Sequence, residues 1–196
     1  AGVLVATIRA LKFHGGVARE DLTQENLPAL RVGLANLNRH INNLRENYGV
    51  PAVVSINQFV SDTDAEVELV MEHCKALGVK VALSSHWANG GAGATDLAHM
   101  VAEICDADAT PANRPHDSFV YSAELTLWEK LEAVATKVYH ASEITANTKV
   151  RDRIKELTDG GYGHLPVCIA KTPYSFSTDP ALKGAPTDHV MDIREV

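Results

Sequence analysis

Residues 5–16 read VATIRALKFHGG and start the pattern on which the expected fold rests. The run Gly2–Ala6 is apolar, β-branched and too short for a helix, which is typical of a buried strand. The chain then continues as a polar loop that carries Arg9, Lys12 and His14 and closes with two glycines. Since α/β proteins bind ligands in loops at the carboxyl ends of their strands, this loop is a candidate anion site. The alternative is that the three cations form ordinary solvated surface.

A strand, a polar loop and a helix recur three times in the first half of the chain. In the first expected helix, leucine and isoleucine recur at steps of three and four, as on one face of a helix. Such alternation predicts parallel strands with right-handed crossovers, so all three polar loops should emerge at one edge of the sheet. After the first strand, we expect helices over Leu27–Leu44, Asp64–Leu77 and Thr95–Cys105, and strands over Pro51–Ile56 and Lys80–Leu83.

The second half predicts part of a separate α/β domain. Residues 106–115 read DADATPANRP, which has no apolar periodicity and is typical of a linker. The expected domains are residues 1–107 and 119–196, joined by residues 108–118. In the second domain we expect helices over Leu125–Val138 and Thr145–Leu157, and strands over Leu165–Ala170 and His189–Ile193.

Two aromatic residues follow expected strands in a position that water would normally reach. Phe59 lies in the loop after the second strand and Trp87 in the loop after the third. Rings on adjacent loops would sandwich a flat heterocycle, with stacking worth about 0.5–1.5 kcal/mol per pair. The alternative is that each ring packs on the helix that follows it.

Asn57 and Asp62 partly match the N-K-x-D pattern by which P-loop GTPases bind guanine, but their spacing is five rather than three. Asn57 is therefore a candidate for the edge of a nucleotide base, or else it ends the strand and bonds loop backbone groups. Ser84, at the end of the third strand, is the other nucleotide candidate. Lys171, after a strand of the second domain, is a further cation of interest. Neither a metal-ligand spacing of histidines nor a G-x-S-x-G motif occurs, so we predict no metal ligand and no hydrolase.

The composition argues against two classes of partner. The chain has 18 basic and 25 acidic residues and a net charge of -7. An acidic chain lacks the positive surface that binds nucleic acid or anionic membranes, so we expect neither. The three cysteines form no C-x-x-C pair and have apolar neighbours. This predicts reduced, buried thiols in a cytoplasmic protein.

The stretch VATIRALKFHGG resembles, position for position, a sequence motif of the formate–tetrahydrofolate ligase family. The rest of the chain is similar to the same family, including INQF at 56–59, DTDAE at 62–66, SSHW at 84–87 and the glycine pair at 90–91. The resemblance implies a P-loop NTPase-like domain of parallel strand–loop–helix units, followed by part of a second α/β domain. It also implies a cytoplasmic homotetramer that acts on small molecules.

The activity implied by the resemblance is the ATP-dependent joining of formate to tetrahydrofolate. Formate is activated as formyl phosphate and then attacked by N10 of the folate, with ATP, Mg²⁺ and in some cases a monovalent cation taking part. By the same resemblance, the pterin lies between Phe59 and Trp87, with Leu83 as apolar wall. From the residues themselves, Asn57 and Ser84 stay the candidates for the nucleotide, and Arg9, Lys12 and His14 are cations that suit formate, phosphate or the folate glutamate.

The phosphate-binding motif G-x-x-x-x-G-K-[ST] of the family does not occur in these 196 residues. The chain also opens on Ala1, so we expect an internal fragment that lacks the P-loop lysine and cannot turn over alone. Two other readings stay open. One is a free-standing, non-catalytic α/β module that binds a ligand, and the other is a GTPase-like switch domain.

Overall fold

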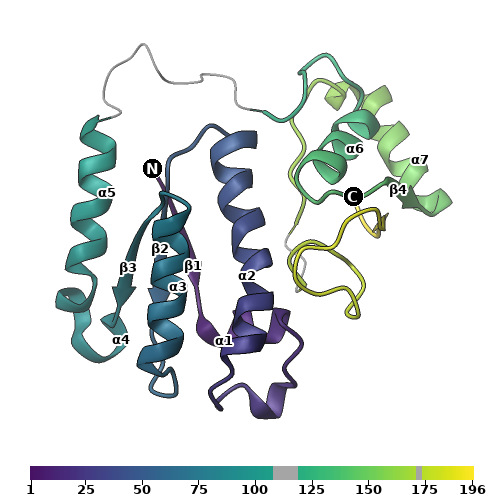
Figure 1. The fold of residues 1–196 in the computed structure, drawn as a ribbon. Coiled ribbons are helices and arrows are strands. Elements are labelled where there is room, and N and C mark those ends of the chain that lie inside the picture. The colour runs from purple at the N-terminus through teal and green to yellow at the C-terminus, as the bar shows by residue number, and fades with distance from the viewer. Residues whose placement is uncertain (108–118, 171–173) are drawn as a thin grey trace. The chain divides into compact units, whose positions relative to one another are not determined.

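The computed structural model describes residues 1–107, 119–170 and 174–196 (Figure 1). The chain divides into two compact units, residues 1–117 and residues 118–196. The expected linker at 108–118 and Lys171 lie outside the described residues. Within the described ranges, none of the helices has the length and apolar character needed to cross a membrane.

Unit 1 contains a parallel sheet with the strand order β1-β2-β3. These strands are β1 (Gly2–Ala6), β2 (Ala52–Asn57) and β3 (Lys80–Ser84). The central strand β2 is buried from its first residue to Ile56, as its almost continuous apolar sequence predicts. The α/β class with parallel strands is therefore confirmed, and the carboxyl ends of the three strands lie at the same edge of the sheet.

The helices of this unit match most of the expected periodicity. Those that follow residue 26 are α2 (Leu27–Asn42), α3 (Asp64–Ala76), α4 (His86–Asn89) and α5 (Thr95–Ala107). Short helical turns extend α2 over Asn43–Asn47, precede α5 over Gly90–Ala94, and occur at Arg19–Asp21. The predicted apolar stripe of α2 is confirmed, because Leu30, Leu34, Leu37 and Ile41 are all buried.

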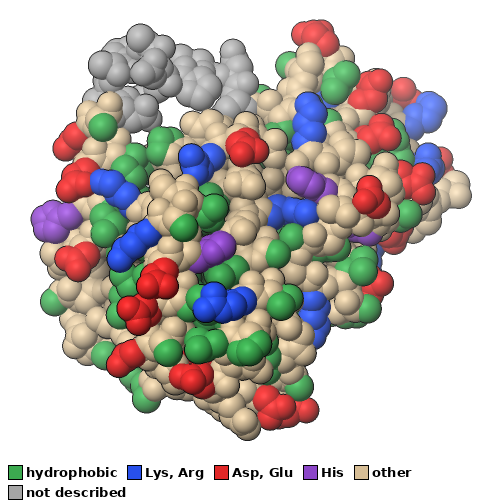
Figure 2. Space-filling model, viewed as in Figure 1, with side chains coloured by type: hydrophobic (Ala, Val, Ile, Leu, Met, Phe, Trp, Pro, Cys, Tyr) green, Lys and Arg blue, Asp and Glu red, His purple; other side chains and the backbone are tan. Residues whose placement is uncertain are grey.

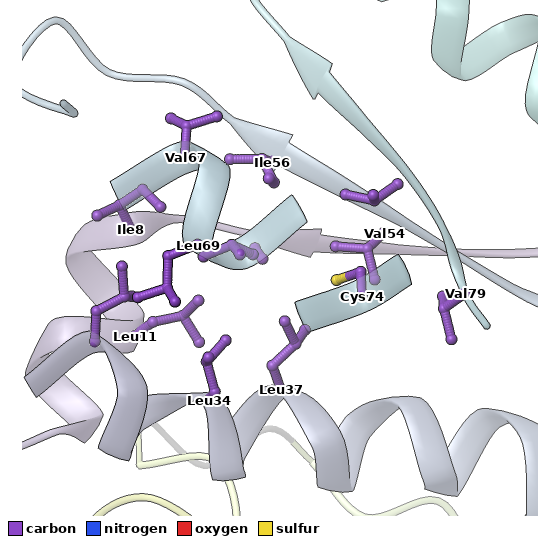
Figure 3. Packing of buried hydrophobic residues seen from close by; sticks show 14 of the residues in the cluster. Ile8, Leu11, Leu34, Leu37, Val54, Ile56, Val67, Leu69, Cys74 and Val79 are labelled. Atoms are coloured by element: carbon purple, nitrogen blue, oxygen red, sulfur yellow. The ribbon is translucent and has the colours of Figure 1, made fainter. Parts of the chain in front are cut away.

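One buried cluster joins the helices to the sheet (Figure 3). Leu34 and Leu37 of α2 belong to it, together with Val54 of β2 and Cys74 of α3. Ile8 and Leu11, which follow β1, belong to the same cluster. The core of unit 1 therefore includes the segment that the sequence assigned to a polar loop.

That assignment is wrong: residues after β1 form the helix α1 (Ile8–His14). The side chain of Thr7 caps this helix by accepting a hydrogen bond from the N–H of Ala10 at 3.1 Å. Ile8 and Leu11 lie three residues apart and are buried, so the packing of one apolar face stabilises a helix of only seven residues. The cations and the terminal glycines concealed this short apolar face.

Two glycines let α1 and α2 approach each other closely. A Cβ atom added to Gly33 of α2 would lie 1.8 Å from the carbonyl oxygen of Leu11, and one added to Gly15 would lie 1.8 Å from that of Ala29. Both obstacles are backbone atoms, which cannot rotate away. The two helices therefore pack against each other only because these positions carry no side chain.

Unit 2 contains a two-stranded parallel sheet with two helices. Its elements are α6 (Leu127–Lys137), β4 (Glu143–Ala146), α7 (Thr148–Leu157), a helical turn at Thr158–Tyr162 and β5 (Val190–Ile193). Strand β4 pairs with β5, with Ile144 opposite Met191. A second buried cluster, which includes Leu131, Ile144 and Met191, forms the core of this unit.

Two predictions for unit 2 are wrong. The expected helix from Thr145 begins at Thr148, because Asn147 caps it and the preceding residues form β4. The expected strand over Leu165–Ala170 forms no ladder with any described strand. The predicted strand near the end of the chain is confirmed as β5.

The three cysteines are free thiols, but only Cys74 is buried. Cys105 lies on α5, which has no buried residue in its described length, and Cys168 is exposed in unit 2. The expectation that all three thiols are buried is therefore wrong for two of them.

In Figure 2, acidic and basic side chains are interspersed rather than grouped by sign.

We predict that Gly33→Ala lowers the free energy of unfolding by about 3 kcal/mol, because the methyl group forces α1 away from α2. Urea denaturation followed by circular dichroism measures the loss. The control is Gly91→Ala, since a Cβ atom there meets no atom within 4 Å. Equal stability of the two variants would contradict the close packing of α1 and α2.

Candidate functional site

Three segments meet at the carboxyl edge of the sheet in unit 1. Helix α1 follows β1, the loop 58–63 follows β2, and α4 follows β3. The loop after β2 is joined to the last residue of β3 by a hydrogen bond of 3.1 Å from the N–H of Gln58 to the carbonyl of Ser84. This is the edge at which open α/β sheets bind their ligands.

An ion pair lies buried beside this edge. The ammonium of Lys12 on α1 lies 2.8 Å from Oε1 of Glu66 on α3, and neither side chain is exposed at all. The ammonium also donates to the carbonyl oxygen of Gln24 at 2.7 Å. The ammonium of Lys12 is therefore paired within this chain, with the carboxylate of Glu66 and the carbonyl oxygen of Gln24.

The carboxylate of Glu66 is bonded on both oxygens. Its Oε1 also accepts from the N–H of Asn26 at 3.0 Å, and its Oε2 accepts from the N–H of Thr63 at 3.3 Å. Burial opposes the ionisation of Glu66, but Lys12 and the two N–H groups outweigh it, so the pKa of Glu66 lies below its ordinary value. The hydroxyl oxygen of Thr63 in turn accepts from the N–H of Glu66 at 3.3 Å, which completes a capping box at the start of α3.

A tight turn holds the loop that carries Phe59. The N–H of Phe59 donates to Oδ2 of Asp62 at 2.8 Å, and the N–H of Asp62 donates to the carbonyl of Phe59 at 3.0 Å. Burial, assisted by the nearby Glu66, raises the pKa of the Asp62 carboxyl despite the bond from Phe59. Because Asp62 directly precedes the capping residue Thr63, the turn is fixed to the start of α3.

The ring of Phe59 is partly exposed and carries a cation on one face. It is 39% exposed, and the guanidinium carbon of Arg9 lies 5.4 Å from its centroid. Arg9 follows β1 and Trp87 follows β3, so they flank the Phe59 loop from opposite sides of the central strand. The arrangement places Arg9 on the β1 side of the ring.

Trp87 lies on the four-residue helix α4 and is 81% exposed. The loop around it is closed by a bond of 3.0 Å from the N–H of Ser85 to the carbonyl of Gly93. A Cβ atom at Gly93 would lie 2.6 Å from the carbonyl carbon of Ser85, so this close approach requires glycine. Trp87 therefore contributes little to the packing of the core, unlike most large aromatic residues.

The other predicted site residues lie at different depths. The hydroxyl of Ser84 is buried and lies 2.7 Å from that of Ser55 on the neighbouring strand. Asn57 and Leu83 are half-buried at the ends of β2 and β3, and Leu83 packs against the core. His14 ends α1 with its ring edge-on to Phe13, at 5.9 Å between centroids. The described residues contain no group of three potential metal ligands.

The sequence analysis did not identify the partnership between Lys12 and Glu66 or the turn made by Asp62. The first joins residues 54 positions apart, which no local pattern reports. The second had a usable signal, because aspartate three residues after Phe59 is typical of a side chain that bonds loop backbone.

We predict that Lys12→Ala lowers the free energy of unfolding by about 3–5 kcal/mol, because it leaves Glu66 buried without its counter-charge. The double variant Lys12→Met/Glu66→Leu removes both charges and should lose less. As a control, Lys80→Ala breaks the exposed pair between Lys80 and Glu103 and should cost about 0–1 kcal/mol. Equal losses in Lys12→Ala and Lys80→Ala, measured by urea denaturation, would contradict the importance of the buried pair.

We also predict that stability falls as the pH is lowered from 6.5 to about 4. Burial, with smaller contributions from His14 and Arg39, lowers the pKa of His40 from 6.5 to about 4. Between these values the unfolded chain binds a proton that the folded chain does not, which favours unfolding. The stabilisation from Glu66 is present above its ordinary pKa of 4.5 and is lost only as the pH falls further, through its lowered folded value.

Urea denaturation at several pH values between about 7 and 4 measures this dependence. The fall should become shallower in His40→Gln and stay unchanged in the control His99→Gln, whose side chain is exposed. An identical pH dependence of wild type and His40→Gln would show that His40 does not cause it.

Comparison with known proteins adds an independent observation. The family model described as formate–tetrahydrofolate ligase matches residues 1–196. The formate–tetrahydrofolate ligase of Methylococcus capsulatus is 56% identical over 197 residues, which cover 100% of this chain and 34% of the relative. The corresponding proteins of Methylibium petroleiphilum and Pelagibacter ubique are 53% and 50% identical, over 100% and 99% of this chain and 35% and 34% of their own.

The chain therefore spans about a third of the length of the curated relatives that it matches. The match extends through both compact units and includes every residue of the carboxyl edge described above. This chain belongs to the formate–tetrahydrofolate ligase family.

Proposed function

We propose that this chain is the folate-binding part of an ATP-dependent ligase that joins formate to tetrahydrofolate and yields 10-formyltetrahydrofolate. The observation that carries the proposal is the pair of exposed aromatic rings, Phe59 and Trp87, on adjacent loops at the carboxyl edge of the sheet. The matching relatives are named as formate–tetrahydrofolate ligases, and a pterin is a flat heterocycle of the kind that such a pair binds.

The proposed binding mode is a layered stack. Arg9 covers one face of Phe59. Trp87 follows β3, which neighbours the strand that precedes Phe59. The pterin enters between Phe59 and Trp87, and Leu83 at the end of β3 supplies apolar wall. Since the Asp62 turn already fixes the backbone of Phe59, little ordering of that ring is needed on binding.

Unit 1 is also proposed to contribute the edge of a P-loop NTPase-like nucleotide pocket. Asn57, half-buried at the end of β2, is the better placed candidate for the base, because the Ser84 hydroxyl already bonds Ser55. Among the predicted anion ligands, Lys12 is the weakest candidate for formate, phosphate or the folate glutamate, because it neutralises Glu66. Arg9 and His14 remain candidates.

The phosphate chemistry is assigned to residues outside this chain. Transfer through formyl phosphate requires a backbone cradle, a lysine and Mg²⁺, and no G-x-x-x-x-G-K-[ST] motif occurs in the 196 residues. The described residues offer no cluster of three ligands that fits the metal ion.

Fluorescence titration with a stable folate analogue tests the platform. The chain has two tryptophans, Trp87 and Trp128, and Trp128 lies in unit 2 with Arg151 4.4 Å from its ring. We expect saturable quenching in wild type and in the control Trp128→Phe, because Trp87 is the reporter. We expect it to be lost in Trp87→Phe and at least about tenfold weaker in Phe59→Ala, which removes a stacking partner.

Quenching that persists in Trp87→Phe, or no binding to the demonstrably folded chain, would contradict a platform within these residues. A further arm examines the outer layer of the stack. Arg9→Met should weaken binding about fivefold by removing the cation–π contact, whereas the exposed control Arg31→Met should not.

The competing function is a non-catalytic α/β module that binds a ligand, and the missing phosphate motif favours it. Formate-dependent ADP release distinguishes the two. We expect none from the 196-residue chain, and we expect the activity in a full-length family member with this chain in place of its own matching third. A folded chimera that binds the folate analogue without releasing ADP would favour the non-catalytic module.

A further inference from the structure

A cavity of about 740 Å³ opens on unit 2. Two runs of consecutive residues line it, 165–170 and 191–196, together with apolar side chains of α6 and α7 such as Leu127, Leu131 and Ile154. Consecutive lining residues mean that the main chain of both runs follows the cavity. Its volume lies within the range of sites that bind a complete ligand or a peptide segment.

The run 165–170 has the alternation of a strand without the partners of one. Val167 and Ile169 are half-buried and pack against the core, whereas Pro166, Cys168 and Ala170 are exposed. No described strand pairs with it. This is the period of two that a strand shows when one of its faces is covered.

Tyr121 occupies one edge of this run. Its hydroxyl accepts from the N–H of Val167 at 2.9 Å and donates to the carbonyl of the same residue at 3.2 Å. In an extended chain, the N–H and C=O of successive residues point to opposite edges. The backbone groups of Cys168 are therefore directed to the edge away from Tyr121.

Strand β5 also offers an edge. It pairs on one side with β4, and the described sheet of unit 2 ends there with two strands. Two strands alone make a marginal sheet, and an unpaired edge next to apolar surface is a template for another strand. Met191 and Ile193 of β5 are among the residues that line the cavity.

We propose that an extended segment from the part of the family polypeptide outside these 196 residues lies in this groove as a β-strand, pairing with β5 and with residues 166–170. The curated relatives are about three times as long as this chain, so such a segment is available within one polypeptide. The apolar floor requires it to carry apolar side chains on the face toward α6 and α7. The sheet of unit 2 would then have four strands.

This proposal also accounts for the failed strand prediction at Leu165–Ala170. The sequence has the composition of a strand because its neighbour in the complete protein supplies the ladder.

Hydrogen–deuterium exchange on two proteins tests the inserted strand. One is the 196-residue chain, and the other is a chimera in which this chain replaces the 197 aligned residues of the Methylococcus capsulatus relative. We expect slower exchange, by at least about tenfold, in the chimera at the amides that face the groove. These are the amides of Cys168 and Ala170, together with the amides of residues 190–193 that do not bond β4. Unchanged exchange at either edge would overturn the proposal. A helix that covers the groove without pairing with the backbone would give this result.

A pair of substitutions in the chimera makes the test specific. Cys168→Pro removes the N–H that points away from Tyr121, so the protection of residues 190–193 should fall toward that of the free chain. Cys168→Ala keeps that N–H and should preserve the protection. Equal protection in both variants would overturn pairing at this edge. Protection of the free chain that appears only at high concentration would also overturn the proposal, because it would identify a second copy of the chain as the occupant.

Discussion

The ion pair between Lys12 and Glu66 joins three segments that the sequence keeps far apart. Removing two charges from water costs several kcal/mol for each ion, so a buried pair persists only where further hydrogen bonds satisfy it. Here the carbonyl of Gln24 and the N–H groups of Asn26 and Thr63 provide those bonds. The start of α3, the loop before α2 and the helix α1 are therefore held together, and the turn that carries Phe59 ends directly before α3.

Much of the fold could be predicted because its signals are local. The β-branched runs marked β1, β2 and β3, and the leucine spacing marked α2. Helix α1 was missed because two buried residues, Ile8 and Leu11, decide its conformation through tertiary packing. The same limit applies to residues 165–170, where the expected strand forms no ladder with a described strand, because local sequence does not report strand pairing.

Sequence could assign the candidate residues to one edge of the sheet, but it could not give their side-chain partners. Parallel strands bring the three following segments to one edge, so the segments that carry Phe59 and Trp87 could be assigned to the same edge from topology alone. The side-chain partners could not be predicted, because local sequence does not distinguish a lysine that binds an anionic ligand from one in a buried ion pair. Lys12 illustrates this, since it occurs in a motif that suggests an anionic ligand and instead binds Glu66. The folate and nucleotide roles remain predictions.

The most direct measurement compares the affinity of a folate analogue for wild type and for the Lys12→Met/Glu66→Leu variant, with circular dichroism to verify that both are folded. If the buried pair organises the Phe59 turn, the folded variant should bind at least about tenfold more weakly, because the loop must then be ordered on binding. An unchanged affinity in the folded variant would contradict the claim that this pair holds the platform in place.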